Sequence, residues 1–158
     1  MRNRMIAGNW KMNKTYDEGV VLAQGLVDEL KDGTGSVDVV VCPPAIDVKG
    51  VAEVIQQANA PIAVGVQNVY WEEKGAYTGE TAPDMITAVG ATYCIIGHSE
   101  RRGYFGETDE DINKKVKALM AHGIVPISCC GESLEVREAG KHVEFVVEQI
   151  KKDTEGLT

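Results

Sequence analysis

The chain has 158 residues, of which 44% are hydrophobic and 25% are charged, and this composition is typical of one folded domain. Acidic residues number 24 against 16 Lys and Arg, so the formal net charge is −8. This charge argues against nucleic acid or an anionic membrane as a partner, because both need clustered positive side chains. No apolar run approaches the ~20 residues that span a bilayer, and we find no signal-peptide pattern. We therefore expect a cytoplasmic protein.

Five short apolar runs alternate with helical patterns along the chain. The runs are rich in β-branched residues and nearly continuous, which is typical of parallel strands buried on both faces. They cover residues 5–7, 37–42, 62–66, 93–96 and 127–130. Strands that alternate with helices predict βαβ units and one parallel sheet. We therefore expect a single α/β domain over residues 1–158.

The helices between these runs are predicted from capping residues and apolar periodicity. In chain order, the predicted caps are Thr15 with Glu18, Asp47, Thr81 with Asp84, and Thr108 with Asp111. The helix that Thr108 starts is expected to close at Gly123, which suits the residue after a helix end. A last helix is predicted from the helical spacing of Val143, Val146, Val147 and Ile150.

The four cysteines carry no recognisable cofactor pattern. No C-x-x-C and no Cys/His metal spacing is present, so we predict no metal site. Free cysteine is among the residue types most often buried, and we expect four buried thiols.

Polar side chains follow the predicted strand ends, where parallel α/β folds build their sites. Asn9 and Lys11 follow the first strand, and His98 and Glu100 follow the fourth. Lys11 is suited to a phosphate or carboxylate, and His98, placed before a helix start, is suited to donating a hydrogen bond to developing negative charge. Plainer roles stay open: a surface lysine, a turn asparagine, a structural histidine, and a glutamate that caps the helix or pairs with Lys11.

The connection 67–80 is long for this kind of fold. Its aromatic side chains need burial, and a projecting loop offers few places within its own chain to bury them. We predict an interface loop, with a lid or a packed surface loop as the alternatives.

Five motifs, in order and spacing, together resemble the triosephosphate isomerase family over essentially the whole chain. They are Ala7-Gly8-Asn9-Trp10-Lys11-Met12-Asn13, Gln67-Asn68-Val69-Tyr70, Gly75-Ala76-Tyr77-Thr78-Gly79-Glu80, Ile96-Gly97-His98-Ser99-Glu100-Arg101-Arg102, and Gly131-Glu132 with Arg137-Glu138-Ala139-Gly140-Lys141. The resemblance implies a TIM (β/α)8 barrel, here incomplete, with residues 1–158 as the N-terminal portion and strands one to five. It also implies an aldose–ketose isomerase of glycolysis and gluconeogenesis, interconverting dihydroxyacetone phosphate and glyceraldehyde 3-phosphate without a cofactor or metal.

The same resemblance assigns roles to individual residues. Asn9 and Lys11 match the substrate-binding pair, with Lys11 also catalytic. His98 matches the electrophile that polarises the carbonyl, and Glu100 matches the acid that pairs with the lysine. Cys129 matches a buried cysteine behind the site. Residues of the 67–80 loop match the contacts of a homodimer: Gln67, Tyr77, Thr78 and Gly79.

The sequence departs from the family's pattern in one major respect. The family's catalytic base is a glutamate after the sixth strand, and residues 1–158 do not reach that strand. We therefore expect this polypeptide alone to be inactive as an isomerase, with strands one and five as open sheet edges. A non-catalytic barrel fragment that serves binding or assembly is the alternative, and another barrel enzyme acting on a phosphorylated sugar is a third.

Overall fold

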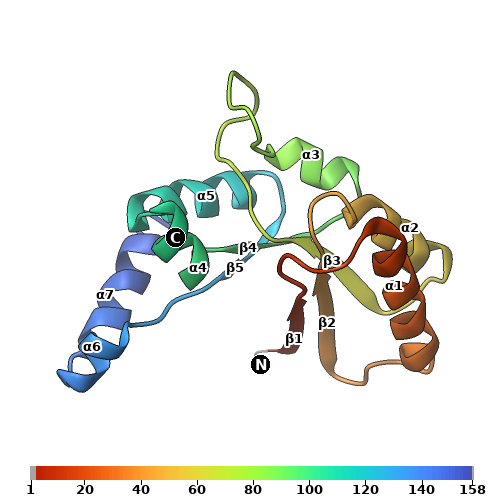
Figure 1. The fold of residues 1–158 in the computed structure, drawn as a ribbon, viewed down its shortest axis with the longest axis horizontal. Helices are drawn as coiled ribbons and strands as arrows, with labels where there is room; N and C mark the ends of the chain where they lie inside the picture. The colour runs from red at the N-terminus through yellow and green to blue at the C-terminus, as the bar shows by residue number, and fades with distance from the viewer. Residues whose placement is uncertain (1–2, 158) are drawn as a thin grey trace.

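The computed structural model describes residues 3–157. Five parallel strands form one sheet in sequence order: β1 (Arg4–Asn9), β2 (Val37–Cys42), β3 (Ile62–Val66), β4 (Tyr93–Ile96) and β5 (Val125–Ser128). The strands follow a curve, and helices cover its outer side (Figure 1). The result is a curled half-barrel of βα units, as an incomplete TIM barrel requires.

Seven helices follow or connect the strands in the described part of the chain. They are α1 (Tyr16–Leu30), α2 (Val48–Gln57), α3 (Pro83–Ala88), α4 (Ser99–Phe105), α5 (Asp109–Ala121), α6 (Leu134–Glu138) and α7 (His142–Asp153). Over residues 3–157, no helix is both long and apolar enough to cross a membrane.

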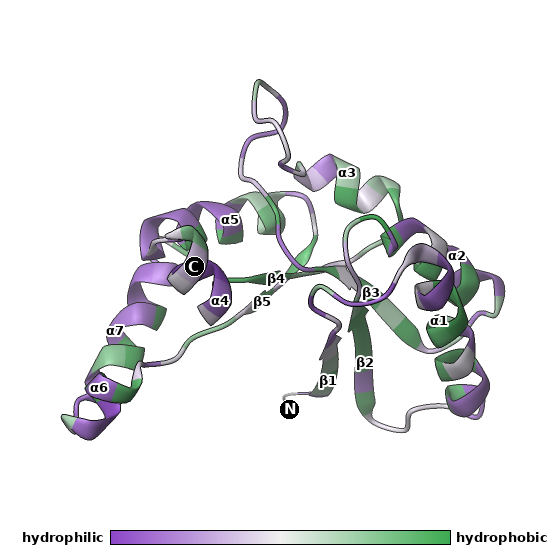
Figure 2. Cartoon of the chain, in the orientation of Figure 1, coloured by the Kyte–Doolittle hydropathy of each residue, from purple (hydrophilic) through white to green (hydrophobic). Residues whose placement is uncertain are grey.

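The three central strands, β2, β3 and β4, are buried or half-buried on both faces, as the continuous apolar runs predicted. The prediction is wrong for the two outer strands, because β1 is largely exposed and β5 is exposed at both ends. Along β2, Val39 and Val41 belong to the cluster that packs against the outer helices, whereas Val40 and Cys42 belong to a second cluster with Ile95. Successive side chains of a strand point to opposite faces, so the two clusters lie on the two sides of the sheet. Figure 2 shows hydrophobic colour along much of the strands and both hydrophobic and polar colour on the helices.

The predicted bounds of three strands are confirmed, and those of the first and fifth strands need correction. β2, β3 and β4 span the predicted residues, and β1 extends beyond residues 5–7 at both ends. The fifth strand was predicted at 127–130 but lies at Val125–Ser128. Pro126 interrupts the apolar pattern, yet a proline is tolerated on an edge strand. Within residues 3–157, neither β1 nor β5 has a neighbouring strand on its outer side.

Two of the predicted helix caps form and two do not. The Glu18 carboxylate accepts the backbone N–H of Thr15 at 2.9 Å, and Thr108 Oγ1 accepts that of Asp111 at 3.2 Å. The third helix begins at Pro83 instead of after Thr81, with no side-chain cap. The Thr81 carbonyl accepts the N–H of Tyr70 at 2.9 Å, which ties this residue to the 67–80 loop.

Asp47 precedes α2 as predicted, but its side chain does not cap the helix. Its exposed fraction is 0%, and neither carboxylate oxygen has a hydrogen-bond partner among the described residues. Burial raises the pKa of the Asp47 carboxyl, because the ionised form is poorly solvated there.

This raised pKa predicts that Asp47→Asn stabilises the chain near neutral pH. The folded state favours the protonated form of Asp47, so this residue stabilises the fold below its unfolded pKa of about 3.8 and loses that contribution as pH rises through the folded pKa. We expect the free energy of unfolding of Asp47→Asn to exceed the parent value by about 1 kcal/mol at about pH 7, and the difference to vanish at acid pH. Urea unfolding at the two pH values measures this difference, with the exposed Asp32→Asn as the control. A loss of stability in Asp47→Asn at neutral pH would show that the carboxylate is favourable.

The last predicted helix exists as α7, but its expected apolar face is not buried. Val143, Val147 and Ile150 are exposed, whereas the polar Gln149 and Asp153 are the buried residues of this helix. The expectation for the cysteines also needs correction: Cys42 and Cys94 are buried, Cys129 is half-buried and Cys130 is exposed. Burial raises the pKa of the Cys42 thiol to about 12, so this thiol is protonated and unreactive.

Candidate active site

The structure brings Asn9, Lys11, His98 and Glu100 together at one pocket, at the carboxyl ends of β1 and β4. The pocket has a volume of about 590 Å³ and extends between the loops that follow β3 and β4. Parallel strands deliver these residues to the same edge of the sheet, although 89 residues separate Lys11 from Glu100.

Lys11 is held in an unusual backbone conformation. Its φ is +56°, a left-handed value that costs a non-glycine residue roughly 1 kcal/mol or more. Its N–H donates to Asn9 Oδ1 at 3.0 Å, and its carbonyl accepts from Gln67 Nε2 at 2.9 Å. These two bonds fix the orientation of the peptide groups on both sides of Lys11. They therefore determine the direction in which the Lys11 side chain leaves the backbone.

The Lys11 ammonium lies 2.6 Å from Glu100 Oε1. Their side chains are 50% and 43% exposed, so the pair adds little to folding stability. Its effect is electrostatic and positional: the hydrogen bond from Lys11 holds the pKa of Glu100 below its usual range. Glu100 is therefore a carboxylate at neutral pH and keeps the lysine at the pocket.

His98 caps the N-terminus of α4, and its Nδ1 accepts the backbone N–H of Glu100 at 3.2 Å. Nδ1 also lies 3.4 Å from Glu100 Oε2, a contact that would be an ion pair only if the ring were protonated. The helical backbone fixes the direction of the amide hydrogen, so we assign Nδ1 as the acceptor. The proton of the neutral ring then lies on Nε2. This tautomer leaves a hydrogen-bond donor for a ligand in the pocket.

Gln67, which the family resemblance places at a dimer interface, contacts Lys11 within the same chain. Its amide group donates to the carbonyls of Lys11 and Cys42, both at 2.9 Å, and its residue is half-buried. This support for Lys11 was missed from the sequence, because 56 residues separate the two positions. The only sequence signal for this role was the position of Gln67 directly after a predicted strand.

The 67–80 loop projects from the body of the fold (Figure 1), and its aromatic side chains pack on one another. The Tyr70 ring stacks on Trp71 with centroids 4.1 Å apart and lies 4.6 Å from Tyr77. Lys114 of α5 covers Trp71 at 4.7 Å. These contacts lie within the same chain, yet none of the three rings is buried, and Tyr77 is 42% exposed. Thr78 and Gly79, at the end of the loop, are exposed.

The fold and pocket define an α/β-barrel protein whose polar groups converge at the carboxyl ends of parallel strands. A sequence model described as "Triosephosphate isomerase" matches residues 4–158. The chain belongs to the triosephosphate isomerase family.

Individual relatives agree with this assignment and also show its extent. The chain is 53% identical to a triosephosphate isomerase of Lactobacillus delbrueckii subsp. lactis over 99% of this chain and 61% of that protein. It is 54% identical to one of Clostridium botulinum over 100% of this chain and 62% of that protein. For a relative from Thermoanaerobacter pseudethanolicus the identity is 51%, with the same coverage as for the Clostridium protein. The chain thus spans about three fifths of the length of the curated relatives it matches.

Proposed function

We propose that residues 1–158 form the substrate-binding and carbonyl-polarising part of a triosephosphate isomerase site. The substrate would be dihydroxyacetone phosphate or glyceraldehyde 3-phosphate. The observation that carries this proposal is the convergence of the Lys11 ammonium and the His98 ring on one pocket, with the Glu100 amide occupying His98 Nδ1. A cation and a neutral N–H donor suit a small phosphorylated ligand that also carries a carbonyl oxygen.

Each of the four residues takes a separate part in the proposed site. Lys11 supplies the positive charge for the phosphate and for the oxygens of the enediolate, and Glu100 holds it in place. Asn9 fixes the Lys11 peptide through its side-chain oxygen. His98 donates from Nε2 to the carbonyl oxygen, where negative charge develops as the neighbouring carbon loses its proton.

We propose further that the base that removes this carbon-bound proton lies outside residues 1–158. Glu100 is a poor candidate, because its carboxylate is paired with Lys11 and its pKa is lowered by that hydrogen bond. The motifs of the chain resemble a family whose base follows a sixth strand, and the described residues contain five strands. By itself this polypeptide would then bind substrate without turning it over.

A homodimer through the 67–80 loop is part of the same proposal. Tyr77 is 42% exposed, and Thr78 and Gly79 are exposed beside it. Two large apolar side chains on the body of the fold are more exposed still, Met12 at 96% and Tyr104 at 81%. Tyr and Met are enriched at the centre of protein interfaces, so these exposed side chains support the proposed dimer.

Titration of the 158-residue chain with dihydroxyacetone phosphate, followed by calorimetry, tests the binding role. We expect saturable binding, and we expect Lys11→Met to weaken it by at least about tenfold because the phosphate loses a charged partner. Lys49→Met is the matched control, since Lys49 forms an exposed ion pair with Glu53 away from the pocket. Equal affinity of the Lys11→Met and parent chains would contradict the proposal, as would an equal loss in both variants.

A further inference from the structure

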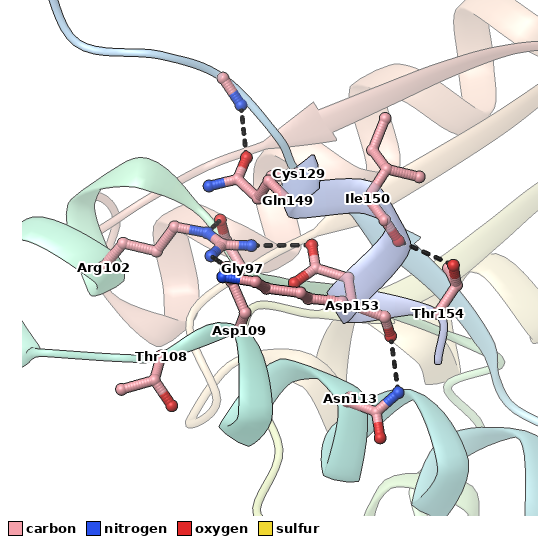
Figure 3. A network of polar contacts seen from close by, with 12 residues as sticks. Gly97, Arg102, Thr108, Asp109, Asn113, Cys129, Gln149, Ile150, Asp153 and Thr154 are labelled. Carbon is pink, nitrogen blue, oxygen red and sulfur yellow. Dashed lines mark hydrogen bonds and ion pairs between the residues drawn. The ribbon is translucent and has the colours of Figure 1, made fainter. Parts of the chain in front are cut away.

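Arg102 of α4 joins three separate segments of the chain. Its Nε donates to the Gly97 carbonyl at 2.8 Å, and its two terminal nitrogens contact the carboxylates of Asp109 and Asp153. The Arg102 side chain is 15% exposed and that of Asp153 only 1%. Figure 3 shows the guanidinium enclosed between the loop after β4, the start of α5 and the end of α7.

α7 contacts a second strand-end loop as well. Gln149 Oε1 accepts the backbone N–H of Gly131 at 2.9 Å, in the loop that follows β5. The two buried residues of α7 thus make these contacts, Gln149 with the loop after β5 and Asp153 with Arg102, and neither lines the pocket at Lys11 and His98. Asn113 of α5 fixes the end of α7 in turn, since its amide donates to the Asp153 carbonyl at 3.1 Å.

Gly97 is the point where this network meets the candidate site. Its φ is +67°, and a Cβ there would lie 3.0 Å from a terminal nitrogen of Arg102 and 3.0 Å from the Cys129 carbonyl. The Gly97 Cα is thus closely packed between Arg102 and Cys129, and Arg102 Nε fixes the direction of the carbonyl in the peptide that joins Gly97 to His98. Because His98 follows at once, the direction of this peptide sets where the imidazole lies relative to the Glu100 amide.

We propose that Arg102 and Asp153 are positioning residues that keep His98 in the tautomer with its proton on Nε2. The buried Asp153 carboxylate holds the guanidinium, the guanidinium holds the Gly97 carbonyl, and the resulting backbone presents the Glu100 N–H to His98 Nδ1. The use of this tautomer in catalysis rests on the proposed function, but the positioning itself does not. It can be measured on the chain without any substrate.

Two-bond ¹⁵N–¹H spectra of ¹⁵N-histidine-labelled chain report the tautomer of each imidazole, and the chain has three histidines. At about pH 8 we expect His98 to carry its proton on Nε2, because the Glu100 N–H occupies Nδ1. In Arg102→Lys, which keeps the charge but loses the Nε donor to Gly97, we expect the tautomer ratio of His98 to fall about tenfold. His122 is an internal reference, because its Nδ1 lies 2.8 Å from the Ala118 carbonyl and its Nε2 lies 3.5 Å from Asp84, and neither contact involves Arg102 or Asp153.

Asp153→Asn is the second variant, since it keeps the shape of the side chain and one acceptor oxygen. We expect a smaller change in the His98 ratio, about threefold, in the same direction. Glu148→Gln on the same helix breaks an exposed pair with Lys151 and should leave His98 unchanged. A role in stability alone would lower the melting temperature of Arg102→Lys or Asp153→Asn without moving the His98 ratio, and that result would overturn the proposal. Failure to bind dihydroxyacetone phosphate would overturn the proposed function and leave this inference standing.

Discussion

Glu107→Gln is expected to lower the free energy of unfolding by about 3–5 kcal/mol. Glu107 and Lys115 form an ion pair whose side chains are only 7% and 3% exposed. Glu107 Oε1 also accepts from Arg101 Nε at 2.7 Å, and Lys115 Nζ donates to Asn68 Oδ1 at 2.7 Å. Removing the carboxylate charge leaves the Lys115 ammonium buried with neutral acceptors only. A buried charge without an opposite charge beside it strongly destabilises the fold.

The same contacts determine the pKa of the Glu107 carboxyl. Burial alone would raise the pKa of this carboxyl, but hydrogen bonds from Arg101 and Lys115 outweigh it and hold the pKa below the usual value of 4.5. A lowered folded pKa means that Glu107 stabilises the fold above its unfolded pKa and loses this contribution as pH falls through the folded pKa. The predicted loss in Glu107→Gln should therefore shrink in acid.

Chemical unfolding of the purified chain at about pH 7 measures the Glu107 effect. A loss of about 3–5 kcal/mol is a large part of the 5–15 kcal/mol that a typical domain has in total. Glu53→Gln is the matched control, because its partner Lys49 lies 3.7 Å away and both side chains are more than half exposed. We expect that control to change stability by less than about 1 kcal/mol. Similar small changes in the two variants would show that the buried pair contributes no more than an exposed one.

The strands were the part of the fold that local sequence determined best. β2, β3 and β4 are central in the sheet and buried on both faces, so their apolar runs begin and end with the strand itself. β5 lies at the edge, where Val125 is exposed and Pro126 is tolerated, and its bounds were misplaced by two residues at each end. The start of α3 was misjudged for a different reason, because the Thr81 backbone is bonded to Tyr70 at the far end of a long loop.

The residues of the candidate site also fall into two groups: those that a local sequence pattern predicts, and those whose roles depend on contacts between distant segments. Asn9, Lys11, His98 and Glu100 could be identified because each follows a recognisable strand end. Gln67 and Arg102 could not be assigned their roles, because each acts on a residue that it meets only in the folded chain. Arg102 and Asp153 are 51 residues apart, and nothing in the local pattern of α7 marks a polar residue as its most buried position.

The 158-residue chain is expected to bind dihydroxyacetone phosphate and to leave its carbon-bound hydrogens in place. In the proposed site Lys11 supplies a positive charge and His98 a polarising N–H, whereas the Glu100 carboxylate is paired with Lys11, which lowers its pKa and makes it a poor base. A positioned general base contributes about 10²–10⁴-fold to a proton transfer. Without one, the exchange of these hydrogens should stay close to the rate in a solution without protein.

Proton NMR of dihydroxyacetone phosphate in D₂O with the chain present tests this central claim in one sample. The account predicts broadened ligand signals that sharpen when Lys11→Met replaces the parent chain, with no loss of the carbon-bound hydrogen signal beyond the protein-free rate and no glyceraldehyde 3-phosphate. Deuterium incorporation or product formation well above that rate would show that residues 1–158 contain a working base. Ligand signals that the parent chain leaves sharp would contradict the binding role of Lys11 and His98.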